Sequence, residues 1–246
     1  MVVYGIILHK QIYNVTARYT FKVEGNLPEE VYIAAEHPDV FDISLNGSKL
    51  KQNDDYNKDR AFIMYNTNKN IKQGENEIII ETSQYNELVT LENIYVIGDF
   101  IVEKKGENFI IKEQEKPVKT GDWTKIGYPF YSGKMIYSGE FVLENDNYKK
   151  VECHLEQLWG KAFNVKINGE NAAVLGWKPY EIDITDYIQD NKNTIEIEVM
   201  NSLQNLLGPH NYLEMEGLVT PNSFYSLKQE KFDKSGFGGK AEIVIY

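Results

Sequence analysis

Apolar and polar residues alternate along most of this chain with a period of two, which is the pattern of strands that bury one face. The alternation is clearest where residues 41–47 read FDISLNG, and it returns 122 positions later where residues 163–169 read FNVKING. Both runs end in Asn-Gly, a strong hairpin signal because both central residues of a type I′ turn need a positive φ. Each run therefore predicts a half-buried strand that ends in a tight turn.

Two further pairs of segments repeat in the same order. Residues 19–24 (YTFKVE) match residues 138–144 (SGEFVLE), and residues 74–80 (GENEIII) match residues 191–199 (NKNTIEIEV). A common offset of about 120 residues is too long for a solenoid and fits a whole small domain. We therefore predict a tandem duplication with two domains, residues 1–114 and 115–246, joined near the charged, proline-containing stretch 112–121.

Short apolar runs between turn residues predict strands throughout, and helical periodicity is nearly absent. In the first half the predicted strands are residues 3–8, 15–24, 30–35, 41–45, 61–65, 76–82, 93–100 and 109–112. In the second half they are residues 139–143, 150–155, 162–167, 180–183, 194–200, 217–220 and 239–246. A helical turn is predicted at residues 185–188, capped by Thr185, with a counterpart capped by Thr67. The spacing is typical of an all-β sandwich.

The charge balance argues against two classes of partner, nucleic acids and anionic membranes. The chain has 26 Lys+Arg against 37 Asp+Glu, a net charge of −11, and its only arginines are Arg18 and Arg60. Nucleic-acid binders need clustered cations and usually arginine, so we expect no nucleic-acid partner. An acidic surface also disfavours anionic membranes, so we expect no membrane partner.

The start of the chain does not read as a targeting signal. Residues 2–8 are apolar, but they lack a basic flank before them and a small-residue cleavage site after them, so we predict a first strand there. No segment is long enough to span a membrane. The location stays open between the cytoplasm and export through an upstream signal. The single Cys153 allows no intramolecular disulfide and is expected to be an inert core thiol.

The second half resembles a known family. Residues 163–169, residues 176–188 (GWKPYEIDITDYI) and residues 193–199 (NTIEIEV) are similar to the sugar-binding, galactose-binding-like domain of family 2 β-galactosidase-like and α-L-rhamnosidase-like glycoside hydrolases. Residues 201–210 resemble a loop in large bacterial members of that group. The first half fits more loosely, since it lacks a counterpart of the Pro-aromatic and Asp-Ile-Thr elements in residues 179–185. The resemblance implies two tandem galactose-binding-like jelly-roll β-sandwiches.

No catalytic residue is predicted in this chain. A glycosidase of the kind that the resemblance implies needs a (β/α)8 or (α/α)6 catalytic domain, and no such alternation of strands and amphipathic helices is present. We therefore expect the catalytic domain elsewhere in the same parent chain. No cofactor is expected. The resemblance allows a structural calcium ion, for which Asn53-Asp54-Asp55 is a faint candidate, but the metal ligands stay unknown.

The second half carries aromatic and polar residues in its predicted loops that suit carbohydrate as a partner. Sugar sites combine an aromatic platform with amides, acids or histidine for the hydroxyl groups. The candidate carbohydrate-binding residues are Trp177, His210, Asn211, Tyr212, Trp159, Trp123 and Tyr128. The competing interpretation is that these side chains pack the domain against a neighbour.

These observations favour a non-catalytic carbohydrate-binding or ancillary region of a larger glycoside hydrolase. Two alternatives remain open. One is an architectural, protein-interaction pair of sandwiches without a sugar site. The other is a free-standing glycosidase with its site between the two sandwiches.

Overall fold

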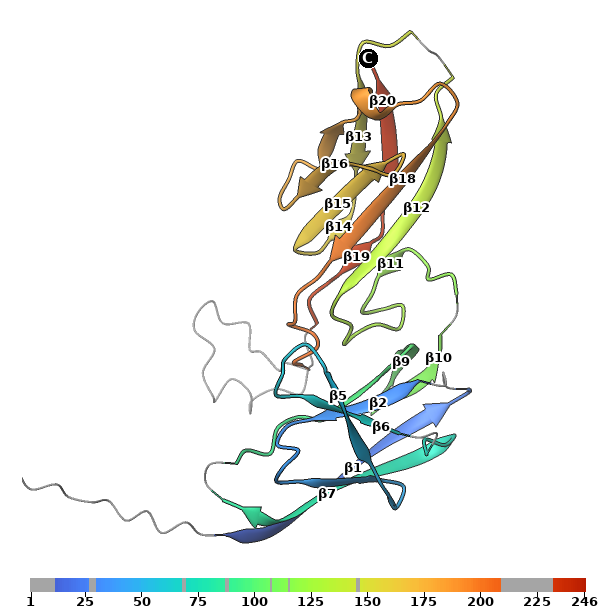
Figure 1. Cartoon of the computed structure of the whole chain (residues 1–246). Helices are drawn as coiled ribbons and strands as arrows, with labels where there is room; N and C mark the ends of the chain where they lie inside the picture. The colour runs from blue at the N-terminus through green and yellow to red at the C-terminus, as the bar shows by residue number, and fades with distance from the viewer. Residues whose placement is uncertain are drawn as a thin grey trace, which may run out of the picture. The chain divides into compact units, whose positions relative to one another are not determined.

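The computed structural model describes residues 12–26, 30–67, 70–86, 89–106, 108–114, 116–144, 147–208 and 232–246. The described chain is nearly all β, which confirms the predicted β-sandwich class (Figure 1). It divides into two compact units, Met1–Lys116 and Pro117–Tyr246. Predicted strands 3–8 and 217–220 lie outside the described residues. In the part that is described, no helix is long and apolar enough to cross a membrane.

The first unit has two sheets. In spatial order the larger consists of β4 (Ser48–Lys49), β3 (Asp42–Leu45), β7 (Gly74–Tyr85), β1 (Tyr13–Glu24), β10 (Asn108–Glu113) and β9 (Phe100–Lys105). The smaller consists of β5 (Lys51–Tyr56), β6 (Ile63–Asn66), β2 (Val31–Ala35) and β8 (Tyr95–Gly98). The pairing of β1 with β10 is parallel, whereas β1 pairs with β7 antiparallel.

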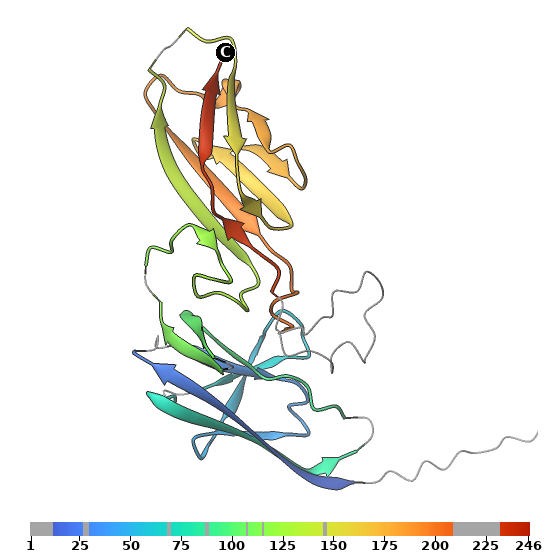
Figure 2. The same cartoon turned by 180° about the vertical axis from the view of Figure 1, so that it is seen from behind.

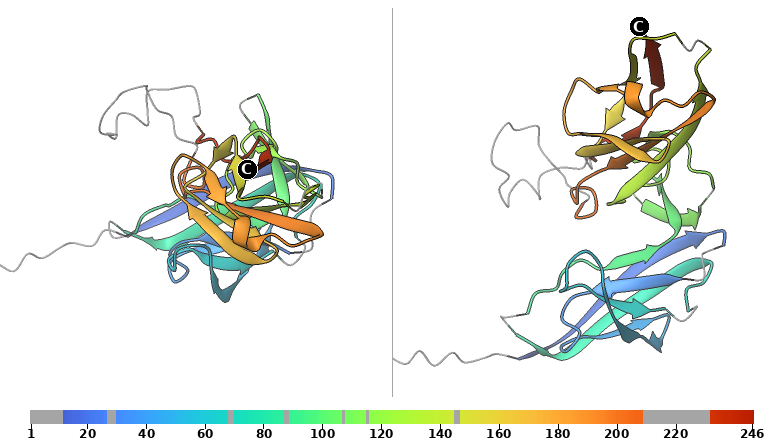
Figure 3. Two further views of the ribbon diagram at one scale, coloured as in Figure 1. Left: turned by 90° about the horizontal axis from the view of Figure 1, so that it is seen from above. Right: turned by 45° about the horizontal axis from the view of Figure 1, so that its top comes forward.

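The second unit has two main sheets and a small third one, which Figure 3 shows from two further directions. The first consists of β12 (Lys134–Val142), β18 (Lys192–Met200), β15 (Ala162–Ile167) and β16 (Glu170–Leu175). The second consists of β17 (Glu181–Asp183), β13 (Val151–Leu155) and β20 (Ala241–Ile245). The third consists of β11 (Gly121–Asp122), β19 (Gly236–Phe237) and β14 (Leu158–Trp159).

Part of the strand order is the same in the two units, whereas β5, β9 and β10 of the first unit and the small third sheet of the second have no counterpart in the matched sheets. The sheet β16-β15-β18-β12 repeats β4-β3-β7-β1, and the sheet β17-β13-β20 repeats β6-β2-β8. The registers correspond as well, since Phe21 lies opposite Asn76 on β7 and Phe141 lies opposite Asn193 on β18. Residues 15–22 of β1 can therefore be matched with residues 135–142 of β12.

Alternation along the strands builds both cores. In the first unit Ile43 and Leu45 of β3 and Ile78 and Ile80 of β7 are buried in one cluster. In the second unit the inward residues of β15 are buried in the same way. Removal of this apolar surface from water is the main force that holds each pair of sheets together.

The predicted Asn-Gly turns are confirmed. Asn46 and Gly47 have φ of 50° and 81°, and Asn168 and Gly169 have φ of 51° and 83°. Positive φ at both positions is what a type I′ hairpin turn requires.

The predicted helical turn is present as η1 (Thr185–Tyr187), but its predicted cap is wrong. The Thr185 hydroxyl donates to Asp183 Oδ1 at 2.6 Å and accepts from the Val151 amide at 2.9 Å, so it ties the turn to β13. Thr67 likewise donates to the Val31 carbonyl at 2.7 Å on β2. The Thr185 oxygen thus accepts from β13 and not from its own turn. Residues 68–69 lie outside the described residues, so the cap by Thr67 stays a prediction.

Candidate functional site

Trp123 is a core residue. Its side chain is 0 % exposed, and its indole Nε1 donates to Tyr137 Oη at 2.6 Å. Gly236 makes this position possible, because a Cβ there would lie 2.8 Å from the indole and 2.1 Å from the Gly121 carbonyl oxygen. Tyr128 is also buried. Neither ring has a face open to a ligand, so both act in packing.

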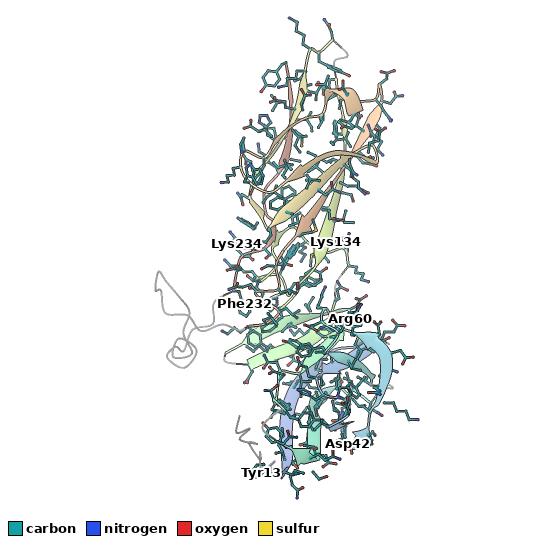
Figure 4. All side chains as sticks on the ribbon, turned by 60° about the vertical axis from the view of Figure 1, so that its left-hand side comes forward. Tyr13, Asp42, Arg60, Lys134, Phe232 and Lys234 are labelled. Carbon is teal, nitrogen blue, oxygen red and sulfur yellow. The ribbon has the colours of Figure 1, made fainter. Side chains whose placement is uncertain are left out.

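Trp159 is half-buried and already has a cation on its ring. Lys234 Nζ lies 3.4 Å from the ring centroid, which is a cation–π contact (Lys234 is labelled in Figure 4). Gly238 lies against the benzene edge of the ring, where a Cβ would come within 2.4 Å. A sugar could stack on Trp159 only after Lys234 had moved away.

Trp177 differs from the other two tryptophans because its side chain is 82 % exposed. It lies on the loop between β16 and β17, two residues after Leu175, the last residue of β16. Val174 of the same strand is 74 % exposed. Tyr180 anchors the loop three residues after Trp177, with its ring 5.2 Å from that of the buried Phe163. Its carbonyl also accepts from the Leu155 amide at 2.9 Å. The loop is thus fixed to the core while the indole remains in solvent.

His210, Asn211 and Tyr212 lie outside the described residues. Their predicted role as sugar contacts stays a prediction.

The structure reveals a polar cluster that the sequence analysis missed, on the outer face of the β17-β13-β20 sheet. Glu152 is at its centre. The Glu152 carboxylate accepts hydrogen bonds from Lys150 Nζ and, at 3.2 Å, from Tyr246 Oη. It also lies 2.8 Å from His154 Nε2. The Lys150 hydrogen bond, followed by the His154 one, lowers the pKa of Glu152 to about 2. Period-2 alternation could have placed Lys150, Glu152 and His154 on one face. Tyr246 joins them only through the pairing of β20 with β13.

The predicted calcium ligands lie on β5, where its register with β6 is irregular. Asn53 Oδ1 accepts from the Asp55 amide at 3.0 Å, and Asp55 Oδ1 accepts from the Tyr56 amide at 2.9 Å. Within the described ranges, no three His, Cys, Asp or Glu side chains gather as a metal site would require. Calcium binding through carbonyl oxygens stays a prediction.

Comparisons with known proteins return only distant structural similarity. No family model and no curated protein matches the chain. A rhamnosidase from a Novosphingobium species matches at 16 % identity and a TM-score of 0.37, over 94 % of this chain and 21 % of that one. The Streptomyces avermitilis α-L-rhamnosidase complexed with L-rhamnose matches at 11 % identity and a TM-score of 0.35, over 95 % of this chain and 26 % of that one.

A lectin from Pleurotus ostreatus matches at 10 % identity and a TM-score of 0.26, over 96 % of this chain and 76 % of that one. This chain therefore spans about a fifth to a quarter of the two rhamnosidases it matches. At TM-scores this low, the similarities carry no inference about a ligand.

Proposed function

We propose that this chain is a non-catalytic carbohydrate-binding region of a larger glycoside hydrolase. In this proposal each unit is a galactose-binding-like jelly-roll sandwich, and the pair is the product of a tandem duplication. The parent chain supplies the catalytic domain, and the second unit holds the sugar. The observation that carries the proposal is the exposed indole of Trp177 on an anchored loop.

An indole in solvent leaves a large apolar surface unburied. Burial of this ring by a ligand would be favourable, and tryptophan is enriched at binding interfaces for that reason. The flat face of an indole complements the C–H face of a pyranose ring, whose hydroxyl groups point outward. Because Tyr180 fixes the loop beforehand, little ordering is needed when a ligand arrives.

The two carboxylates of the polar cluster do not fit the general acid of a glycosidase. The general acid of a glycosidase must keep its proton at working pH, so its pKa is raised. The pKa of Glu152 is lowered to about 2, and hydrogen bonds from Thr185 lower the pKa of Asp183. Both groups are carboxylates and cannot serve as that acid.

Calorimetric titration of the full chain with galactosides and L-rhamnosides tests the proposal. We expect Trp177→Ala to weaken binding about tenfold or more, as a residue at the centre of a small site does. Trp177→Phe should retain most of the affinity. Tyr56→Ala, which removes an exposed aromatic from the first unit, is the control and should change nothing.

Two outcomes would contradict the proposal. One is the absence of binding to every sugar tested, which would leave an architectural role. The other is sugar binding that Trp177→Ala does not weaken, which would place the site elsewhere. Turnover of nitrophenyl glycosides by this chain alone would instead support a free-standing glycosidase.

A further inference from the structure

The second unit contains a cavity of about 500 Å³, and every residue that lines it belongs to this unit. Residues of β12 and β20, which are edge strands of the two main sheets, contribute to its lining (β12 is yellow-green and β20 red in Figure 2). Its floor consists of the buried side chains of Ile195, Ile197 and Phe237. The cavity thus reaches the core of the sandwich.

The walls of the cavity are apolar and uncharged. Among the described residues that line it, none is Asp, Glu, Lys, Arg or His, although 26 % of the chain is charged. Its polar side chains are the hydroxyl groups of Thr120, Ser138 and Tyr137, and that of Tyr137 already accepts from Trp123 Nε1. Burial of an unpaired charge is costly, and a sugar would leave most of its hydroxyl groups unpaired. The cavity therefore suits a neutral apolar ligand.

The size of the cavity and its ring contacts narrow the class of ligand. A cavity of about 150 Å³ holds benzene, so about 500 Å³ has room for two or three fused rings. The lining rings of Tyr137 and Phe237 lie 5.5 Å apart at an edge-to-face angle of 69°. Aromatic rings favour edge-to-face and offset-stacked neighbours, so a flat aromatic ligand extends this pair. A flexible acyl chain gains from burial alone and is ordered at greater cost.

A comparison of the two units shows how the cavity arises. In the match of β1 with β12, Ala17 corresponds to Tyr137 and Tyr19 to Gly139. Tyr19 packs against the core of the first unit. In the second unit Gly139 adds no side chain at the level of Ile195, which lies opposite it. The exchange of a large and a small residue along the strand therefore leaves the space beside Gly139 unfilled.

Residues 117–120 form the outer wall of the cavity. Among the described residues, Pro117, Val118 and Thr120 make no backbone hydrogen bond to β12. Val118 is half-buried, whereas Pro117 and Thr120 are exposed. A segment without backbone hydrogen bonds to the strand across the cavity opens at lower cost than a paired strand. A ligand is therefore expected to enter between this segment and β12.

We propose that the second unit binds a small neutral aromatic molecule of two or three fused rings in this cavity, between residues 117–120 and the core side chains of β12, β18 and β19. The ligand takes the space that the side chain of Tyr19 fills in the first unit. The site is separate from the proposed sugar contact at Trp177, because none of residues 176–180, all of which the structure describes, lines the cavity.

Two probes with the same ring system test the chemistry of the site. 2-Naphthol is neutral at pH 7, whereas 2-naphthoate carries a charge. Calorimetric titration of the full chain measures the affinity of both. We expect 2-naphthol to bind one site per chain with a Kd of about 10–100 µM, at least about tenfold tighter than 2-naphthoate, because the walls offer a carboxylate no partner.

Two pairs of variants locate the site. Gly139→Leu fills the space, whereas the Cβ of Gly139→Ala would lie 3.5 Å from Ile195 Cγ2, an ordinary contact. Val118→Asp places a carboxylate in the outer wall, whereas Val118→Leu keeps the wall apolar. We expect Gly139→Leu and Val118→Asp to weaken 2-naphthol binding at least about tenfold, and both controls to change it less than about threefold. Circular dichroism verifies folding. If Gly139→Leu does not fold, the Val118 pair, which lies outside the sheets, decides.

The proposal is overturned if 2-naphthol at about 1 mM does not bind, or if 2-naphthoate binds equally well. Undiminished binding to folded Val118→Asp also overturns it, because the probe would then lie elsewhere. Tighter binding of 1-octanol than of 2-naphthol would replace the aromatic class with acyl chains. Trp177→Ala should leave 2-naphthol binding unchanged while it weakens sugar binding, so the two proposals can fail separately.

Discussion

The side-chain amide of Asn168 donates from Nδ2 to Oδ1 of Asn193 at 2.7 Å, and the same atoms join Asn46 to Asn76 at 2.9 Å. The remaining bonds of the two pairs also correspond. Asn168 and Asn46 each accept from a strand amide, of Thr194 at 2.8 Å and of Glu77 at 3.0 Å. Each pair therefore fastens an Asn-Gly turn to the start of a neighbouring strand.

Loss of the buried member of a pair should destabilise its unit strongly. Asn193 is 0 % exposed, accepts from the Gln189 amide at 2.8 Å and donates to the Gln189 and Asn191 carbonyls. Asn193→Ala leaves these backbone groups unpaired, so we expect the free energy of unfolding to fall by about 3 kcal/mol in urea denaturation. Asn171→Ala, at an exposed position of β16, is the control. A change below about 0.5 kcal/mol for Asn193→Ala would contradict this role of the pair.

The Trp123–Tyr137 hydrogen bond gives a second prediction. Tyr137→Phe keeps the ring but removes the acceptor of the buried indole N–H. Because an unpaired buried donor is costly, we expect a loss of about 1–2 kcal/mol in unfolding free energy. Tryptophan fluorescence should shift little, since the indole stays buried. Unchanged stability would mean that the indole N–H of Trp123 donates to another acceptor in the variant.

The lowered pKa of Glu152 predicts how the free energy of unfolding changes at acidic pH. Its pKa in the folded chain is about 2, below its ordinary value of 4.5, so the stability it contributes is fully present above pH 4.5. That contribution is lost as pH falls through the folded pKa. We expect Glu152→Gln to lower the unfolding free energy at pH 6 and to flatten its decline between pH 4.5 and 2. Parallel declines in both proteins would contradict this assignment.

Cys153 should react only when the second unit opens. Burial raises the pKa of its thiol to about 12, and the side chain is fully enclosed between β17 and β20. The thiolate is the reactive form, so we expect negligible reaction with Ellman's reagent at pH 8 in the native protein. In urea the reaction should be complete within minutes. A fast native reaction would show that β13 is exposed without unfolding.

Features that depend on neighbouring residues could be predicted from the sequence, whereas features that depend on contacts between distant residues could not. The Asn-Gly turns follow from the φ preferences of two adjacent residues, and the paired strands follow from alternation. β5 was missed because its sequence, KQNDDY, has no apolar face, and β16 because ENAAVL alternates weakly.

The surroundings of the predicted site residues and of Glu152 depend on residues distant in the sequence. The burial of Trp123 requires Gly236, and the exposure of Trp177 was not visible from composition, although both tryptophans were predicted to lie in loops. Glu152 gained its third partner, Tyr246, from the last residue of the chain. Neither relationship leaves a periodic trace in the sequence.

The two asparagine pairs also bear on the chemical ageing of the protein. Deamidation of Asn-Gly requires the side-chain amide to swing onto the following backbone nitrogen, and asparagine is accordingly a thermolabile residue. In the folded chain Asn46 and Asn168 are each held by three hydrogen bonds, which must break first. Deamidation would replace a donor with a carboxylate facing the Oδ1 of Asn76 or Asn193, so the damaged turn could not close again. Each unfolding of a unit would thus give its Asn-Gly turn a chance to deamidate, and the resulting negative charge would be irreversible.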